Sequence, residues 1–194
     1  MPDGVNDTAI VLIPKVPHPK ELKDFSPISL CNVVYKIVSN CMVNRLRHLL
    51  MDLISENQSA FIPGHLISDN SIIAFECIDY IQSLKGSTNM CCAYKLDLLK
   101  LYDRVDWNFL EKALLKWGFS SAWISRIMAC FTLVKYLVMF NGKFLESYAP
   151  TRGLRQGGPL SPFVFLFVVD ALFALISEAT VVNGLHGVHI CRRA

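Results

Sequence analysis

The sequence predicts an α+β fold, because segments with helical periodicity alternate with short runs typical of β-strands. Residues 30–53 carry apolar side chains at every third or fourth position, which predicts a long amphipathic helix. Residues 132–148 are rich in Val, Tyr and Phe around Asn141-Gly142, the pair that most strongly favours a β-hairpin. An apolar run at residues 9–13 stops at Pro14 and predicts a strand.

The other elements follow from their caps and breakers. Residues 24–29 are typical of a turn, with Ser29 as the N-cap of the first helix. The remaining predicted elements are a helix from Asp69 or Asn70 to about Leu84, a strand at residues 90–96, a helix at residues 109–117 with an Asn108–Glu111 capping box and Gly118 as its stop, and helices at residues 123–131 and 163–176. Asp103 and Asp106 are expected to cap the helix at residues 109–117.

Composition and charge limit the class of protein. With 194 residues, 53% of them apolar and 18% charged, the chain can bury a core and is not a disordered polymer. Its net charge of +3 permits a nucleic-acid partner without indicating one. The cysteines form no Cys-x-x-Cys pair and no secretory leader precedes them, which predicts reduced thiols in an intracellular protein of the nucleus or cytoplasm.

One carboxylate, Asp97, is placed where a metal ligand is expected. It ends the predicted strand at residues 90–96, which would hold the carboxylate rigidly, and the next carbonyl, at Leu98, can supply a second oxygen to Mg²⁺. Nucleotide polymerases use divalent ions to stabilise the attacking and leaving oxygens of phosphoryl transfer. On spacing alone, a helix N-cap or a solvated turn is the commoner role of such an aspartate.

A glycine-rich loop at residues 152–162 opens the last predicted helix. Gln156-Gly157-Gly158 supplies an amide beside two residues without side chains, which lets a base pair and its sugars approach the backbone. Arg152 and Arg155 are placed to contact phosphates of a substrate. An ordinary connecting loop is the alternative, but together with Asp97 the loop suggests a nucleotide polymerase.

Ordered motifs run along nearly the whole chain. They are Ala9–Lys15, Asp24–Ile37, Asn44–Leu46, Gln58–Gly64, Lys95–Asp97, Tyr102–Trp107, Arg152–Gly157 and Pro159–Pro162. In this order they resemble the reverse transcriptase domain of LINE-type (non-long-terminal-repeat) retrotransposons, most closely those of plant genomes.

The resemblance implies a right-hand polymerase with fingers and an incomplete palm, lacking the last palm strands and the thumb. Residues 1–90, with the hairpin at about 132–150, would form the fingers-like part, and residues 91–194 would form the palm. The implied activity is RNA-directed DNA synthesis from dNTPs on an RNA template and a DNA primer, with Mg²⁺ as cofactor. The resemblance implies no membrane and indicates no oligomeric state.

The resemblance also assigns roles to single residues. Asp97 matches the first catalytic, metal-binding aspartate, and Leu98 matches the position that lends a carbonyl oxygen to the metal. Tyr102, which by its pattern alone either packs in the core or lies under a deoxyribose ring, matches the aromatic steric gate against a 2′-hydroxyl. Gln156 and Gly157 match the pair that lies along the templating base and the incoming nucleotide.

The chain departs from the family's pattern at several positions. Ser26 stands where an arginine is expected to hold the triphosphate, and the other departures are His65, Leu99, Leu101 and Gly158. The family's second metal motif, an aromatic-small-Asp-Asp hairpin, is expected after Ile190, but no aspartate follows Asp170. Because one carboxylate cannot hold two ions, we expect this polypeptide by itself to be inactive.

Two other functions remain open. One is a non-catalytic remnant that binds nucleic acid, with an affinity that falls steeply with salt. The other is a small membrane protein that spans the bilayer at residues 163–176, although this run contains Asp170 and is shorter than the roughly twenty residues a span needs. Separately, His186, His189 and Cys191 form only a weak zinc cluster, because no fourth ligand lies nearby.

Overall fold

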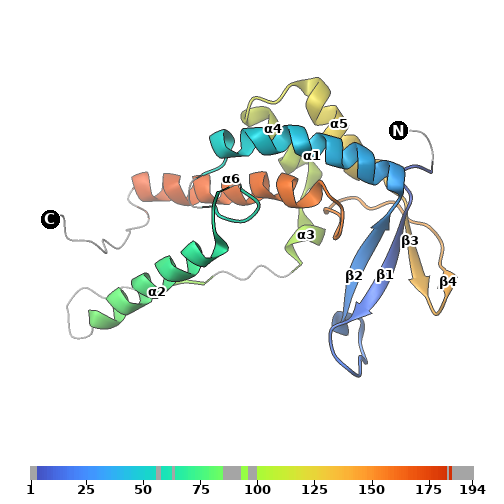
Figure 1. Ribbon diagram of the computed structural model, residues 1–194, viewed down its shortest axis with the longest axis horizontal. Helices are drawn as coiled ribbons and strands as arrows, with labels where there is room; N and C mark the ends of the chain where they lie inside the picture. The colour runs from blue at the N-terminus through green and yellow to red at the C-terminus, as the bar shows by residue number, and fades with distance from the viewer. Residues whose placement is uncertain are drawn as a thin grey trace.

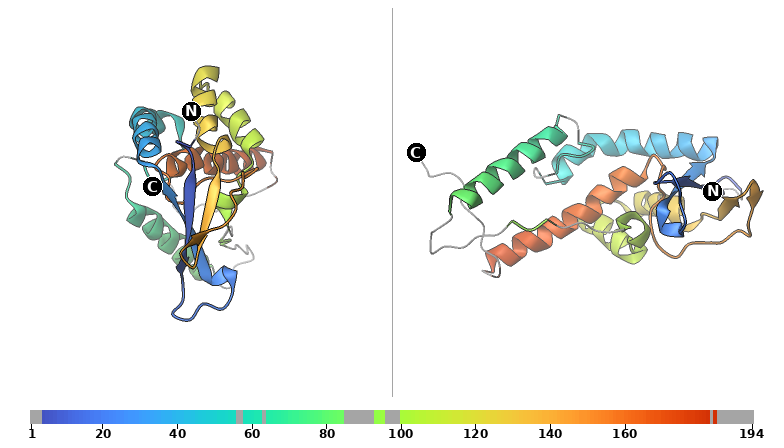
Figure 2. Two further views of the ribbon diagram at one scale, coloured as in Figure 1. Left: turned by 90° about the vertical axis from the view of Figure 1, so that its right-hand side faces the viewer. Right: turned by 90° about the horizontal axis from the view of Figure 1, so that it is seen from below.

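The structure is a computed structural model that describes residues 4–55, 58–62, 64–84, 93–95, 100–182 and 184. These residues form a four-stranded mixed sheet and a group of helices (Figure 1), which confirms the predicted α+β class. Figures 1 and 2 show the sheet at one end of an elongated molecule and helix α2 (Ile67–Ser83) toward the other end.

The sheet combines strands from both halves of the chain. Strand β1 (Thr8–Pro14) pairs antiparallel with β2 (Phe25–Cys31) and parallel with β3 (Tyr136–Phe140), which pairs antiparallel with the short β4 (Lys143–Phe144). The strand order is β2-β1-β3-β4, so β2 is an edge strand. Asn141 and Gly142 join β3 to β4 with φ angles of +49° and +76°, which confirms the predicted hairpin.

Strand β2 stands where the sequence predicted a turn at residues 24–29. Pro27 of β2 pairs with Leu12 of β1. The backbone nitrogen of Pro27 points to the same side of the strand as the N–H of Ser29, which is directed away from β1 and toward a loop. Because β2 is an edge strand, the N–H that Pro27 lacks removes no bond from the ladder. Ser29 is therefore not a cap; Asn32 caps the following helix by accepting a bond from the Val34 N–H at 2.9 Å.

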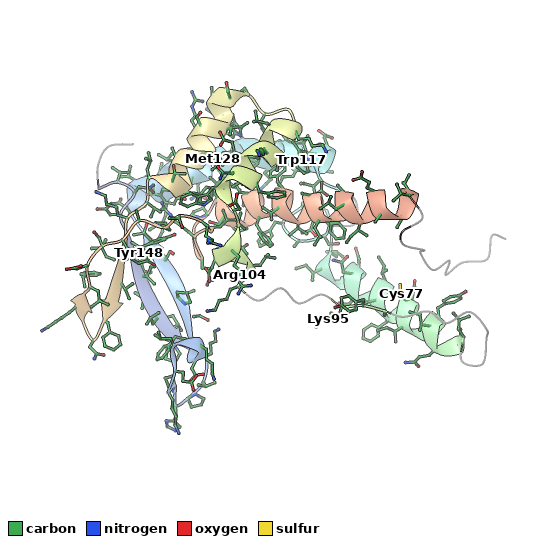
Figure 3. The ribbon with its side chains drawn as sticks, turned by 180° about the vertical axis from the view of Figure 1, so that it is seen from behind. Cys77, Lys95, Arg104, Trp117, Met128 and Tyr148 are labelled. Carbon is green, nitrogen blue, oxygen red and sulfur yellow. The ribbon has the colours of Figure 1, made fainter. Side chains whose placement is uncertain are left out.

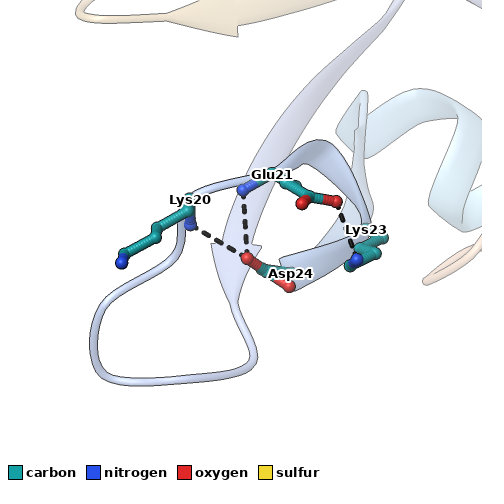
Figure 4. Close-up of polar contacts among 4 residues, drawn as sticks. All are labelled: Lys20, Glu21, Lys23 and Asp24. Carbon is teal, nitrogen blue, oxygen red and sulfur yellow. Dashed lines mark hydrogen bonds and ion pairs between the residues drawn. The ribbon is translucent and has the colours of Figure 1, made fainter.

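The connection between β1 and β2 is held by Asp24 (Figure 4). Its carboxylate accepts backbone hydrogen bonds from Lys20 at 2.9 Å and from Glu21 at 3.0 Å, and these bonds lower the pKa of Asp24. Glu21 also pairs with Lys23 at 2.7 Å, but both side chains are exposed, so this pair contributes little stability. A single turn of 3-10 helix, η1 (Leu22–Asp24), then leads into β2.

Four helices form the hydrophobic core. They are α1 (Val33–Leu53), α4 (Trp107–Lys116), α5 (Ser121–Thr132) and α6 (Ser161–Val181). Helix α6 contacts α1 and α4, and α4 also contacts α5. Trp117, labelled in Figure 3, lies among these helices. Its ring and that of Phe119 pack edge-on against Phe167 of α6, with ring centroids 5.6 and 5.5 Å apart. The predicted long helix is thus confirmed, beginning at Val33 rather than at residue 30.

Helix α4 begins two residues earlier than predicted. Asp106 caps it, because its Oδ1 accepts a hydrogen bond from the Phe109 N–H at 2.8 Å, as the sequence predicted for this aspartate. Asn108 lies inside the helix, so the predicted capping box at this residue is wrong. Gly118 has a φ angle of +82° and ends the helix as expected.

Helix α6 is longer than the predicted helix at residues 163–176. It has 21 residues and is long and apolar enough to cross a membrane. The prediction that this helix is too short for a membrane span was therefore wrong. Its first half nevertheless belongs to the core, with Phe163, Val164, Leu166 and Phe167 buried. Asp170 accepts a hydrogen bond from the Ser55 N–H at 3.0 Å, which ties α6 to the end of α1.

Helix α2 is the least covered helix. It starts at Ile67 with no side-chain cap, so neither Asp69 nor Asn70 has the predicted capping role. None of its residues is buried, and its exposed apolar side chains include Ile67, Ile72, Ile73 and Phe75. Residues 93–95 are the described part of the strand predicted at 90–96, and they are not in a strand.

Candidate functional site

Part of the predicted site lies outside the described residues. This applies to Asp97 and Leu98, the predicted metal-binding pair, and to the cluster of His186, His189 and Cys191. Within the part of the chain that the structure describes, no group of three or more His, Cys, Asp or Glu side chains could hold a metal ion. The site is therefore built from the residues after position 100 and from the glycine-rich loop.

The short helix α3 (Leu101–Arg104) is bonded to the glycine-rich loop. Leu154 N donates to the Tyr102 carbonyl of α3 at 2.7 Å. Two more hydrogen bonds join the loop to the residues that follow α3, from Gly153 N to Val105 O at 2.8 Å and from Trp107 Nε1 of α4 to Gly153 O at 2.8 Å. The structure thus brings together Tyr102 and the Gln156 loop, two sequence regions that were predicted to act together.

Gly153 makes this close contact possible. Its φ angle is +93°, a conformation that residues with a Cβ rarely adopt. A Cβ at this position would lie 2.9 Å from the Asp103 carbonyl oxygen, which is closer than real Cβ atoms approach. A larger residue would therefore push α3 away from the loop.

Tyr102 packs toward the core. Its ring stacks on Phe165 of α6, with centroids 4.7 Å apart and an angle of 24° between the planes. Burial raises the pKa of Tyr102, although the side chain is only half-buried. Core packing is thus observed, and the role of Tyr102 as a steric gate stays a prediction.

The Gln156-Gly157 turn is fixed against the edge strand β2. The Ser29 N–H donates to the Gln156 carbonyl oxygen at 2.8 Å. Gly157 has a φ angle of +94°, and a Cβ there would lie 3.2 Å from the Ser29 carbonyl oxygen. The close approach that this glycine permits in the structure is therefore to β2, while Gly157 itself is exposed.

Arg155 is a core residue, with only 1% of its surface exposed. Its guanidinium carbon lies 4.1 Å from the ring centroid of Tyr35, and Nη2 donates to Asn6 Oδ1 and to the Cys130 carbonyl at 2.7 Å. The prediction that Arg155 contacts a phosphate is wrong for this arrangement, because a phosphate in solvent cannot reach the guanidinium. Its sequence position gave no signal of this burial.

Two groups near Arg155, the half-buried Tyr136 and the buried Cys130, have raised pKa values. Burial raises the pKa of Tyr136 to about 12, and Arg155 opposes that shift in part. Burial likewise raises the pKa of the Cys130 thiol to about 11. These side chains stay protonated at neutral pH, so they act as uncharged packing groups around a buried cation.

A pocket of about 280 Å³ lies between the sheet and the glycine-rich loop. Its lining includes Ile10, Pro27, Ser29, Asp103, Tyr136, Tyr148, Pro150, Arg152 and Gln156. Figure 3 shows Tyr148 near the strands and Arg104 on α3, the elements that border this region. Arg152 is exposed, so it is the predicted phosphate-contacting arginine that solvent can reach.

Asp103 is a pocket residue that the sequence interpretation missed. It was expected to cap a helix, but it lies in α3 and its Oδ1 accepts a hydrogen bond from Gln156 Nε2 at 3.3 Å. Burial raises the pKa of Tyr148, and the negative charge of Asp103 adds to this shift. The signal that was available is its position directly after Tyr102, on the same short helix.

Comparison with known proteins decides the family. The family model for reverse transcriptase (RNA-dependent DNA polymerase) matches residues 13–192, which is most of the chain. The chain belongs to the reverse transcriptase family. The match includes every predicted site residue, from Asp97 to Gly157.

Three relatives of this chain are proteins of transposable elements. It is 27% identical over 179 residues, or 92% of the chain, to the transposon TX1 uncharacterized 149 kDa protein of Xenopus laevis, covering 13% of that protein. It is 25% identical over 89% of the chain to the retrovirus-related Pol polyprotein from type-2 retrotransposable element R2DM of Drosophila melanogaster, covering 16% of it. It is 30% identical over 90% of the chain to the retrovirus-related Pol polyprotein from type-1 retrotransposable element R2 of Nasonia vitripennis, again covering 16%.

These relatives confirm the resemblance to non-long-terminal-repeat retrotransposons, whereas the similarity to plant elements stays a prediction. The chain spans between 13% and 16% of the length of these three proteins. It therefore corresponds to a reverse transcriptase segment within much longer relatives.

Proposed function

We propose that this chain forms the fingers and part of the palm of an RNA-directed DNA polymerase. Residues 1–90, with the hairpin at about 132–150, belong to the fingers, and residues 91–194 belong to the palm. Gln156 and Gly157 contact the templating base and the incoming nucleotide on an RNA template and a DNA primer. Tyr102 excludes a ribose 2′-hydroxyl.

The observation that best supports this proposal is the bonding between α3 and the glycine-rich loop. The carbonyl of Tyr102 accepts a hydrogen bond from the residue two positions before Gln156, at 2.7 Å. Backbone contacts of this kind hold a site rigidly, because they do not depend on flexible side chains. Tyr102 and Gln156 therefore have fixed relative positions, as a shared nucleotide site requires.

The metal-binding role of Asp97 and Leu98 is also proposed. Carboxylate and carbonyl oxygens are the ligands that Mg²⁺ prefers, so the donor types fit. Bound Mg²⁺ would stabilise the charge that develops on the reacting phosphate oxygens. Both residues lie outside the described part of the chain, so their proposed role is supported by the family match. The nearest described site residue is Tyr102, five positions after Asp97.

Titration of an RNA–DNA template–primer by fluorescence anisotropy tests the binding function. Phosphate contacts make affinity fall linearly with salt on a logarithmic scale, so measurements from 50 to 200 mM salt should show a steep decline. Arg152→Gln should weaken binding and reduce the slope by about one, because it removes one phosphate contact. Arg126→Gln, at an exposed position of α5 outside the pocket, is the matched control. Equal effects of the two variants, or no binding at all, would contradict the proposal.

Primer extension with Mg²⁺ separates catalysis from binding. We expect this 194-residue polypeptide to bind the hybrid without extending the primer, because it presents one matching metal carboxylate where two ions are needed. Templated synthesis would show that its own side chains complete the metal site. Recovery of the chain in carbonate-washed membranes would instead support the membrane alternative, for which α6 has sufficient length.

A further inference from the structure

We propose that Asp103 is a positioning residue that sets the orientation of the Gln156 amide in the pocket. This inference rests on the proposed function, in which Gln156 contacts a nucleotide. Both side chains line the pocket, and Gln156 Nε2 donates to Asp103 Oδ1 at 3.3 Å. The distance is long for a bond to a charged group, so the contact contributes direction more than stability.

The chemistry of the two groups explains the orientation. An ionised carboxylate only accepts hydrogen bonds, whereas an amide has one donating nitrogen and one accepting oxygen. Gln156 must therefore turn its nitrogen toward Asp103 and its Oε1 away from it. An asparagine at position 103 would tolerate both orientations, because its own amide can donate or accept.

The backbone holds both partners in place. The Asp103 carbonyl packs against Gly153 so closely that a Cβ on the glycine would lie 2.9 Å away. The Gln156 carbonyl oxygen accepts the Ser29 N–H at 2.8 Å. With both main chains fixed, the side-chain bond decides how the amide is presented.

This orientation selects the chemical class of the group that Gln156 contacts. Oε1 accepts hydrogen bonds, so it suits a ligand hydroxyl or amino group, such as those of a nucleotide sugar or base. The neighbouring negative charge of Asp103 repels a phosphate oxygen from the same side of the pocket. Arg152 is the cationic residue in the pocket lining, so phosphate is expected near Arg152 and a donor group near Gln156.

Side-chain NMR tests the orientation directly. The chain contains Gln58, Gln82 and Gln156, so selective ¹⁵N-glutamine labelling gives a side-chain amide signal for each, with the first two as internal controls. Gln156→Asn assigns the signal of interest. In Asp103→Ala, we expect the Gln156 amide protons to move to values typical of a free amide, and in Asp103→Glu to return toward the wild-type values. An unchanged Gln156 signal in Asp103→Ala would overturn the inference.

A double-mutant cycle on template–primer binding tests the functional consequence. Asp103→Ala and Gln156→Ala should each weaken binding by about two- to tenfold, the effect of one hydrogen bond, and the double variant should bind no more weakly than either single one. Additive losses would mean that the residues act separately and would refute positioning. Glu111→Gln, at an exposed site of α4 outside the pocket, should bind normally. If the wild-type chain does not bind the hybrid, the proposed function fails, and the NMR result still decides the role of Asp103.

Discussion

Replacing Gly153 with alanine tests the contact between α3 and the glycine-rich loop. The φ angle of +93° is unfavourable for alanine, at a cost of about 1–2 kcal/mol. The new Cβ would also lie 2.9 Å from the Asp103 carbonyl oxygen, so the chains must separate. Separation would break the two hydrogen bonds of Gly153, each contributing about 0.5–1.5 kcal/mol. We therefore expect the free energy of unfolding to fall by about 2–5 kcal/mol.

Gly118→Ala is the matched control for this experiment. Gly118 has a similar φ angle of +82°, but a Cβ there would meet no atom within 4 Å. In this variant the free energy of unfolding should fall only by the conformational cost of the positive φ angle, about 1–2 kcal/mol. Urea unfolding followed by tryptophan fluorescence measures both losses, and Trp107 reports locally because its indole bonds to Gly153. Equal losses for the two variants would refute the reasoning, since the steric contact would then have no cost.

Three further predictions concern other parts of the molecule. Asp106→Ala should lower the free energy of unfolding by about 0.5–2 kcal/mol through loss of the α4 cap, which urea unfolding would detect. Burial raises the pKa of Tyr136 from the ordinary 10.0 to about 12, so its contribution to stability is complete below pH 10 and is lost as the pH rises toward 12. Burial also raises the pKa of Tyr35, so absorbance titration should show more than one late tyrosine, and Tyr136→Phe should remove one of them. Leu175→Glu, on the exposed part of α6, should reduce concentration-dependent association in light scattering, and unchanged association would show that this surface is not responsible.

Features decided by adjacent residues were predictable from the sequence. The β3–β4 hairpin follows from Asn141-Gly142, because both residues readily adopt the positive φ angles that the turn needs. Helix α1 follows from the periodicity of its own apolar side chains, and its predicted end at Leu53 is confirmed. Each of these signals lies within the element that it predicts.

Features decided by distant partners were not predictable in the same way. Strand β2 forms because its residues pair with β1, and the turn signal of Pro27 is overridden at a sheet edge. Arg155 is buried because Asn6, 149 positions away, and the Cys130 carbonyl, 25 positions away, accept its hydrogen bonds. No pattern around Arg155 reveals these partners.

The candidate site contains one feature that the sequence predicted and one that it did not. The proximity of Tyr102 to the Gln156 loop agrees with the sequence interpretation, which rested on two motifs in family order. Asp103 was assigned to a helix cap because carboxylates favour helix starts, and only the fold shows that Gln156 lies within hydrogen-bonding distance. The roles of Asp97 and Leu98 stay predictions.

The bond between Ser29 and Gln156 has a consequence for solubility. An open sheet edge offers N–H and C=O groups to strands of other molecules and so promotes fibre-like assembly. On the outer side of β2, the Ser29 N–H is already occupied by the loop and Pro27 has none to offer. The opposite edge, β4, is only two residues long. Strand addition is thus hindered at the β2 edge and limited to two residues at the β4 edge. Copies of this chain should therefore associate through their helices.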